Sequence, residues 1–206
     1  MKILLCGEGK TELGGWASHP GLRSESPEAG ILESLLKRVK AEGWSIENAV
    51  LWKDLKKRDG FPRPYRAHNQ GPAEARNILN LVKAARDQGC TAVVFSRDRD
   101  CDSNREQDVV AGIERARKLV DDRPFIAGGM AVESIESWVA SLQGTRNAEA
   151  SGNPKALLKV DSLAEKRHIV ESEPFPRIPE DAKSLRSWLS SVASLFGIPS
   201  ESLFQD

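Results

Sequence analysis

Residues 91–96 read TAVVFS, and residues 97–102, which follow directly, read RDRDCD. The first run is short, apolar and partly β-branched, which is typical of a buried strand in a parallel sheet. Residues 2–6 (KILLC) have the same character, and residues 46–52 and 124–128 are weaker strand candidates. Four strand-like segments in the first two thirds of the chain indicate a sheet at the centre of the fold.

Helical patterns lie between these strand-like segments. Residues 28–42 and 72–88 carry apolar side chains at helical spacing, and the second of them begins at Pro72, a favoured first helical position. Ser103 and Glu106 form a possible capping box for a further helix. The alternation predicts an α/β fold with a Rossmann-like, mostly parallel sheet flanked by helices.

The C-terminal third of the chain is more polar than the rest. Residues 1–142 contain the alternation and are expected to form the core, with an inserted basic loop at residues 53–70. Residues 143–206 are expected to form a small helical extension packed on that core. Helical spacing within the extension occurs at residues 154–160 and 181–196.

Composition excludes several classes of protein. The chain has 30 basic and 30 acidic residues, so any contact with nucleic acid must be local rather than driven by net charge. Cys6, Cys90 and Cys101 lack metal-ligand spacing and fit a reducing compartment, so we expect a cytoplasmic protein. The first apolar run is too short for a signal peptide, and no stretch approaches the roughly 18 apolar residues of a membrane span.

The segment CGEGKTELGG, residues 6–15, resembles a phosphate-binding loop only in part. A Walker A loop needs glycine where the chain has Leu4, and a dinucleotide fingerprint needs glycine where it has Glu12. What remains is Glu8 at the end of the first strand-like run. Glu12 follows four residues later and would point the same way on a helical turn. Solvated loop acids are the alternative interpretation of this pair.

Three aspartates, Asp98, Asp100 and Asp102, alternate after TAVVFS. Because ligands bind at the carboxyl edge of an open α/β sheet, we expect these acids to lie near Glu8. An extended segment places the first and third on one side, and clustered carboxylates with nothing basic between their oxygens repel unless a cation neutralises them. The sequence therefore predicts a Mg²⁺ or Mn²⁺ site, with Glu12 as a further candidate ligand.

Other uses of these motifs fit the spacing less well. An EF-hand needs glycine and glutamate where the chain has Ser103 and Val109. A phosphatase of the haloacid-dehalogenase type would carry its DxD after the first strand. The histidines, His19, His68 and His168, are scattered, and none pairs with a cysteine, which disfavours a zinc site.

GEGKTE and DRDCD resemble, in order, spacing and placement, the Toprim domain of topoisomerases, primases and OLD-family nucleases. IESWVASL, NPKALLKV and AKSLRSW extend the likeness to the small stand-alone Toprim-like proteins of bacterial defence loci. The resemblance implies that Glu8 is a metal-linked general acid or base and that Asp98 and Asp100 are primary Mg²⁺ ligands. It also implies that Glu12 binds a second ion and that Lys155 is the late lysine of OLD-type sites.

The positions of five further residues in the sequence lead to expectations about them. Glu133 and Glu136 are expected on one face of a helix after the fourth strand, where Glu136 is either a site residue or a solvated acid. Trp138 and Trp188 fall on apolar helical faces and are expected in the core. Tyr65 lies in the basic loop and is no counterpart of the topoisomerases' nucleophile, so strand passage is not expected.

These observations lead to three hypotheses about function. The first is a Mg²⁺-dependent Toprim-like nuclease of DNA or RNA, working with an ATPase partner in an anti-phage system. The second is a catalytically silent Toprim-like module that binds a partner, and the third is a metal-dependent hydrolase of small phosphoesters. The basic loop would steer a polynucleotide toward the carboxylates or is a solvated insertion. Its basic residues are Lys53, Lys56, Lys57, Arg58, Arg63 and Arg66.

Overall fold

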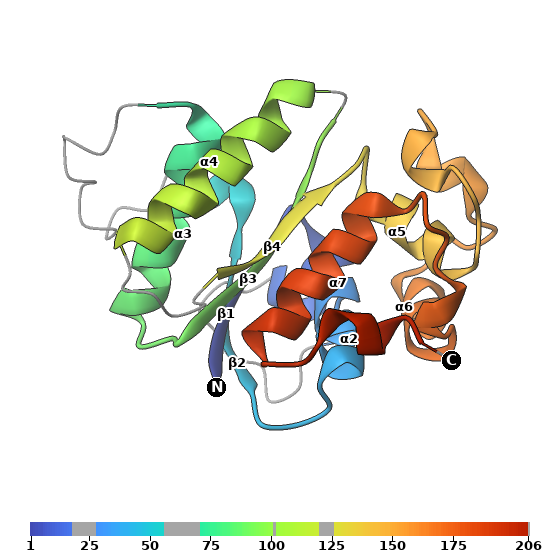
Figure 1. Cartoon of the computed structure of the whole chain (residues 1–206), viewed down its shortest axis with the longest axis horizontal. Helices are drawn as coiled ribbons and strands as arrows, with labels where there is room; N and C mark the ends of the chain where they lie inside the picture. Colours follow the sequence, from blue (N-terminus) through green and yellow to red (C-terminus); the bar gives the residue numbers. More distant parts are fainter. Residues whose placement is uncertain (18–27, 56–70, 101, 120–125, 206) are drawn as a thin grey trace.

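The computed structural model describes residues 1–17, 28–55, 71–100, 102–119 and 126–205 (Figure 1). Within these residues, four parallel strands form one sheet in the order β2-β1-β3-β4. The strands are β1 (Lys2–Gly7), β2 (Ser45–Leu51), β3 (Ala92–Asp98) and β4 (Ile126–Ala131). The predicted α/β fold with a parallel sheet is confirmed, and each strand lies where the sequence placed it, within a few residues.

Helices flank the sheet and account for most of the remaining described residues. The α-helices are α1 (Lys10–Leu13), α2 (Ile31–Val39), α3 (Ala73–Asp87), α4 (Ser103–Leu119), α5 (Ile135–Leu142), α6 (Leu163–Ser172) and α7 (Lys183–Leu195). Short 3₁₀ turns are η1 (Gly14–Ala17), η2 (Trp52–Asp54), η4 (Ala148–Ala150), η5 (Pro154–Leu157), η6 (Phe175–Arg177) and η7 (Ser200–Leu203).

The helix predicted at residues 154–160 is only the 3₁₀ turn η5, because the backbone returns to an extended conformation at Leu158. The longer helix in this region is α6, which the sequence interpretation missed. Its start carries a complete capping box, in which the Ser162 hydroxyl accepts from the Glu165 amide and the Glu165 carboxylate accepts from the Ser162 amide.

Alternation along the buried strands divides the core into two layers. Ile3 and Leu5 of β1 pack with α2 and α7, whereas Leu4 and Cys6 face the side covered by α3 and α4. Figure 1 shows α3 and α4 together on one face and α2, α5, α6 and α7 on the other. Both faces are covered, which explains why β1 and β3 read as continuous apolar runs.

The handedness of the crossovers explains this distribution. The chain moves from β1 to β2 in one direction and from β2 past β1 to β3 in the other. Right-handed crossovers then require α2 and α3 on opposite faces, and α4 on the same face as α3. The reversal creates a topological switch point between β1 and β3, which is where open α/β sheets bind ligands.

Helix α7 packs along β4 and joins the C-terminal residues to the sheet. The indole of Trp188 donates to the Phe95 carbonyl at 2.8 Å, and the Ser191 hydroxyl accepts from the Gly128 amide at 3.2 Å. Trp138 and Trp188 are 0% and 1% exposed, and their ring centroids are 5.5 Å apart. Both tryptophans are therefore core residues, as predicted, and residues on either side of position 142 share one apolar cluster.

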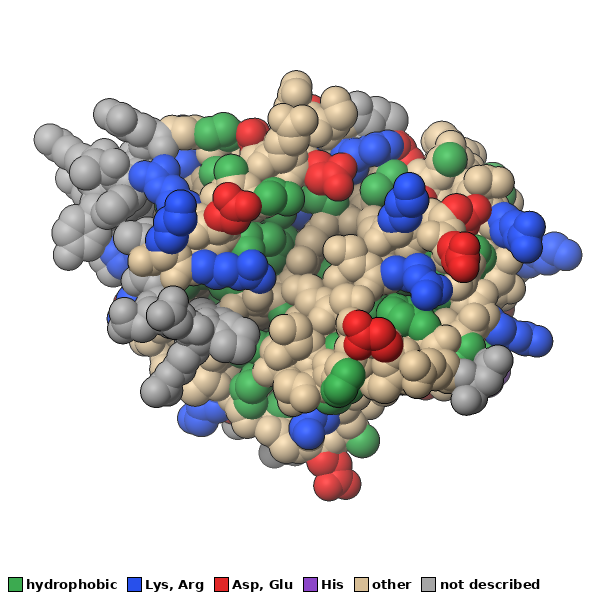
Figure 2. All heavy atoms as spheres, in the orientation of Figure 1, with side chains coloured by type: hydrophobic (Ala, Val, Ile, Leu, Met, Phe, Trp, Pro, Cys, Tyr) green, Lys and Arg blue, Asp and Glu red, His purple; other side chains and the backbone are tan. Residues whose placement is uncertain are grey.

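The surface is hollowed between α4 and α7, above β4 (Figure 2). This groove has a volume of about 640 Å³, and its floor includes Gly128 and Gly129 of the outer strand. In the described part of the chain, none of the candidate acids or lysines lines it. Among the same residues, no helix has the length and apolar character needed to cross a membrane. Most of the basic loop, residues 56–70, lies outside the described residues, as does Cys101.

Candidate functional site at the carboxyl edge of the sheet

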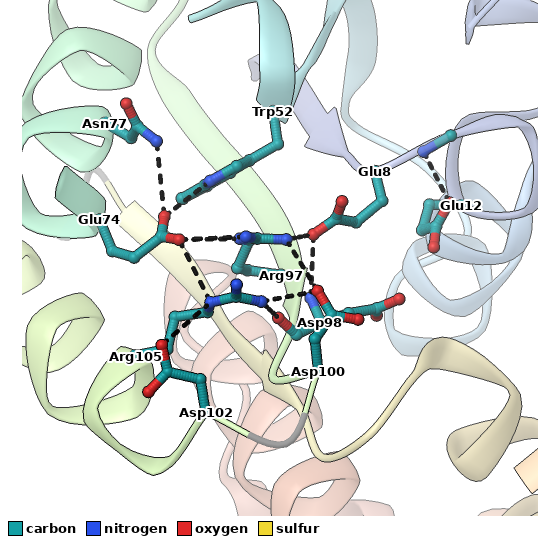
Figure 3. A network of polar contacts seen from close by, with 11 residues as sticks. Glu8, Glu12, Trp52, Glu74, Asn77, Arg97, Asp98, Asp100, Asp102 and Arg105 are labelled. Atoms are coloured by element: carbon teal, nitrogen blue, oxygen red, sulfur yellow. Dashed lines mark hydrogen bonds and ion pairs between the residues drawn. The ribbon is translucent and has the colours of Figure 1, made fainter. Parts of the chain in front are cut away.

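Glu8 and Asp98 meet at the switch point although they are ninety positions apart. Glu8 directly follows β1, Asp98 ends β3, and Cys6 pairs with Phe95 in the register of the two strands. The Asp98 amide donates to Oε1 of Glu8 at 3.3 Å (Figure 3). The sequence prediction that these two acids converge on one edge of the sheet is therefore confirmed.

Asp98 is a half-buried acid with an unsatisfied oxygen. Its Oδ1 atom is inaccessible to solvent and has no hydrogen-bond partner among the described residues. Burial, followed by the charges of Glu12, Asp100 and Glu136, raises the pKa of Asp98 to about 8 against the opposing effect of Arg97. An acceptor without a donor, in a place where negative charge accumulates, has the character of a cation ligand.

Glu12 lies beside this acid but is held differently from the prediction. Helix α1 begins at Lys10, after Glu8, so the two glutamates do not form a pair on one helical face. Instead, Oε2 of Glu12 accepts from the Gly9 amide at 2.9 Å and caps the helix. Burial raises the pKa of Glu12 and so does Glu136, whereas the two backbone hydrogen bonds and Lys155 lower it. Glu12, Glu136 and Asp98 therefore belong to one cluster of interacting acids.

The DxDxD segment does not continue as an extended strand. Strand β3 ends at Asp98, and Asp100 adopts a left-handed turn conformation with φ of 49° because the chain must turn into α4 within a few residues. The Asp100 side chain is 58% exposed. Asp102 accepts from the Asn104 amide at 3.1 Å and so caps α4. The expected extended alternation of the aspartates is therefore wrong beyond Asp98.

The expectation that nothing basic separates the carboxylates is also wrong. Nη1 of Arg97 forms an ion pair with Oε1 of Glu8, and Nη1 of Arg105 lies 2.6 Å from Oδ2 of Asp100. Alternation along β3 explains the first contact, because Arg97 faces the α3 and α4 layer while Asp98 faces the other layer. Glu8 lies at the boundary and accepts hydrogen bonds from both sides (Figure 3).

Glu136 lies in the buried part of the cluster and pairs with a lysine that the sequence interpretation missed. It is 5% exposed, and Nζ of Lys166 lies 3.0 Å from its Oε1. Burial opposes ionisation, but the hydrogen bond and charge of Lys166 lower the pKa of Glu136 overall. Lys155, the lysine that the Toprim resemblance implies, is instead exposed at the surface. The capping box at the start of α6 is the sequence signal that would have placed Lys166 on a helix.

Glu133 does not share a helical face with Glu136. It precedes α5 in a left-handed conformation with φ of 65°, and its Oε1 lies 2.5 Å from Nη2 of Arg99. The reason is that β4 ends at Ala131, which leaves a turn of three residues before the helix begins. Glu133 therefore pairs with Arg99 and does not join Glu136 on one face of α5.

Glu74 is a second residue that the sequence interpretation missed. It lies in the first turn of α3, where its Oε2 accepts from the Trp52 indole at 2.8 Å and from the Asn77 amide group at 3.4 Å. Its Oε1 accepts from Arg97. The helix start at Pro72 was recognisable in the sequence, but nothing local indicated that Glu74 reaches the end of a strand more than twenty positions away.

Few side chains at the carboxyl edge of the sheet are available as ligands for a cation such as Mg²⁺. In the described parts of the chain, no three histidine, cysteine or acidic side chains are arranged to hold a metal ion together. Mg²⁺ commonly binds through one or two carboxylates and keeps several waters. Glu8 and Asp98 are the two acids that meet at this edge, through the Asp98 amide, and Oδ1 of Asp98 is unsatisfied among the described residues.

Comparisons with protein-family models, with curated proteins and with solved structures give no match for this chain. The class that the coordinates define is an α/β fold with a four-strand parallel sheet and an acidic cluster at its carboxyl edge.

Proposed function

We propose that the protein is a Mg²⁺- or Mn²⁺-dependent phosphodiesterase that hydrolyses DNA or RNA, with a Toprim-like site at the carboxyl edge of the sheet. The observation that carries the proposal is the junction of Glu8 and Asp98 at the switch point, with Oδ1 of Asp98 buried and unpaired among the described residues. Hard carboxylate oxygens in this position are the ligands that Mg²⁺ prefers.

Glu8 and Asp98 would hold the cation, and the exposed Asp100 could join them by leaving Arg105. When bound, Mg²⁺ supplies an acidified water and neutralises charge on the phosphate. Glu8 has a side chain that is 30% exposed, so it can exchange a proton with solvent at the rim of the sheet. Lys155 is exposed near Glu12 and would meet the negative charge of the scissile phosphate.

Matched substitutions test this proposal. Asp98→Asn and Glu8→Gln each remove one carboxylate charge with little change in shape, and Asp87→Asn makes the same change at an exposed position at the end of α3. Calorimetric titration with Mn²⁺ should show binding to the parent and to the Asp87 variant, and none to the other two. Cleavage of labelled DNA and RNA should follow the same order. A parent protein that binds no Mn²⁺, or an Asp98 variant that cleaves at the parent rate, would contradict the proposal.

A catalytically silent binding module is the second candidate. The observation that favours it is the ion pair between Arg97 and Glu8, which already neutralises one of the two proposed ligands. Such a module would bind neither Mg²⁺ nor Mn²⁺ in the calorimetric titration. A comparison of free nucleotides with polynucleotides as substrates separates the nuclease from a hydrolase of small phosphoesters. The proposed ATPase partner and role in phage defence rest on the Toprim resemblance alone.

A further inference from the structure

We propose that Arg97 binds the phosphate group of the substrate and that Glu74 is the positioning residue that aims its guanidinium group at the carboxyl edge of the sheet. This inference rests on the proposed function, because it names the residue that recognises the anionic part of the substrate. Arg97 lies at the centre of the polar network in Figure 3, between Glu74 on one side and Glu8 on the other.

Glu74 is itself held firmly. The Trp52 indole and the Asn77 amide group donate to its Oε2, and its side chain is only 12% exposed. Its Oε1 accepts from Nη2 of Arg97 at 3.1 Å and from Nε of Arg97 at 3.3 Å. Nε of Arg105 lies 3.4 Å from the same oxygen. Both carboxylate oxygens therefore have donors, and Glu74 has a single orientation that fixes the arginine beside it.

The contact with Glu74 uses one edge of the Arg97 guanidinium group and leaves Nη1 on the opposite side. Nη1 points at Oε1 of Glu8 and lies 3.8 Å from Oδ2 of Asp100. The guanidinium carbon lies 5.7 Å from the centroid of the Trp52 ring, so the aromatic side chain also restricts it. The edge of this fixed, planar cation that Glu74 does not hold therefore faces the carboxyl edge of the sheet, where Glu8 is its present partner.

Arg97 and a divalent cation would compete for the same carboxylate, that of Glu8. A divalent cation on Glu8 would displace Nη1 of Arg97, and a phosphate oxygen would then replace the carboxylate as its acceptor. The guanidinium group matches the geometry of phosphate oxygens, and its charge-assisted hydrogen bonds are strong. Glu74 keeps the displaced arginine in place, so that little side-chain freedom is lost when the phosphate arrives.

A purely structural ion pair makes different predictions from a phosphate-binding arginine. If Arg97 only supports the fold, its replacement should lower thermal stability and affect the cation and the nucleic acid alike. If Arg97 binds phosphate, its replacement should weaken nucleic-acid binding while the cation binds at least as tightly, because one competitor for Glu8 is gone. The two ligands therefore have to be measured separately.

The experiment uses Arg97→Gln, Arg97→Lys and Glu74→Gln, with Arg177→Gln as the control. Arg177 is an exposed arginine paired with Glu173 in the C-terminal region, so its replacement removes the same charge far from the network. Mn²⁺ binding is measured by calorimetry, and binding of a short fluorescent DNA or RNA oligonucleotide is measured by anisotropy in Ca²⁺, which takes the same oxygen ligands. Thermal melts confirm that each variant is folded.

For Arg97→Gln we expect the oligonucleotide to bind about tenfold to a hundredfold more weakly, with Mn²⁺ binding retained or tightened. Arg97→Lys keeps the charge and protects the fold, but one ammonium group cannot contact Glu74 with two donors and also reach a phosphate. We expect it to lose about tenfold in oligonucleotide affinity. Glu74→Gln should raise the KM for cleavage more than it lowers kcat and should weaken Mn²⁺ binding, because Arg97 then turns fully to Glu8.

Oligonucleotide binding by a folded Arg97→Lys variant at the affinity of the parent would overturn the inference. Loss of Mn²⁺ binding in that variant would also overturn it, because Arg97 would then support the cation site rather than compete with it. A parent protein that binds no Mn²⁺ is a different result, which contradicts the proposed function and the inference together. Arg177→Gln should match the parent in both binding measurements.

Discussion

Replacing Asp98 with asparagine should make the cation-free protein more stable at alkaline pH. The ordinary pKa of an aspartate is 3.8, and burial is the chief reason why the pKa of Asp98 is about 8 in the folded protein. Between these two values the folded state keeps a proton that the unfolded state releases, so stability falls as the pH rises. From about pH 5 to about pH 8 this group alone should remove about 3.5 kcal/mol from the free energy of unfolding.

The assay is urea denaturation in EDTA across that pH range. The parent should lose stability with rising pH, whereas Asp98→Asn, which has no charge to bury, should lose about 3.5 kcal/mol less. Asp87→Asn, the same change at an exposed position, should follow the parent. Mn²⁺ at the alkaline end should restore stability to the parent and not to the Asp98 variant, since a ligand stabilises only a state that binds it. Parallel pH profiles for the parent and Asp98→Asn would refute the reasoning.

Two further substitutions test the packing around the site. Lys166→Met should cost about 3 kcal/mol of stability in urea denaturation because it leaves Glu136 buried without its partner, and Lys166→Met/Glu136→Gln should recover most of that loss. A much smaller loss of stability in Lys166→Met would show that water solvates the pair of Lys166 and Glu136. Gly7→Ala should cost about 1 to 3 kcal/mol and weaken Mn²⁺ binding, because its new methyl group would lie 2.7 Å from Cβ of Glu12. Gly129→Ala, which meets no atom within 4 Å, is its control and should be nearly neutral.

The strands and their common edge were predictable because the information is local. A short apolar run identifies a strand, and the carboxyl ends of parallel strands meet, so the meeting of Glu8 and Asp98 follows from the fold class alone. The short α1 was harder, because four residues give almost no periodicity. Its start decides whether Glu12 points with Glu8 or folds back onto the Gly9 amide, and the structure shows the second arrangement.

The pairing of charges could not be predicted in the same way. Arg97 and Asp98 are neighbours in the sequence, but alternation sends them to opposite faces of β3, and their partners come from distant segments. Glu74 and Lys166 reach the site from α3 and α6, and only the packing of those helices determines which acid each one meets. A cluster that we expected to hold no basic group between its carboxylates therefore contains fixed arginine and lysine side chains in the structure.

Diffraction from crystals soaked in Mn²⁺, recorded for anomalous scattering from manganese, tests the central claim most directly. We expect a manganese peak between the carboxylates of Glu8 and Asp98, with Arg97 withdrawn from Glu8 toward Glu74. A fully soaked crystal with no peak at the carboxyl edge of the sheet, and with the ion pair between Arg97 and Glu8 intact, would contradict the claim that these two acids share a cation.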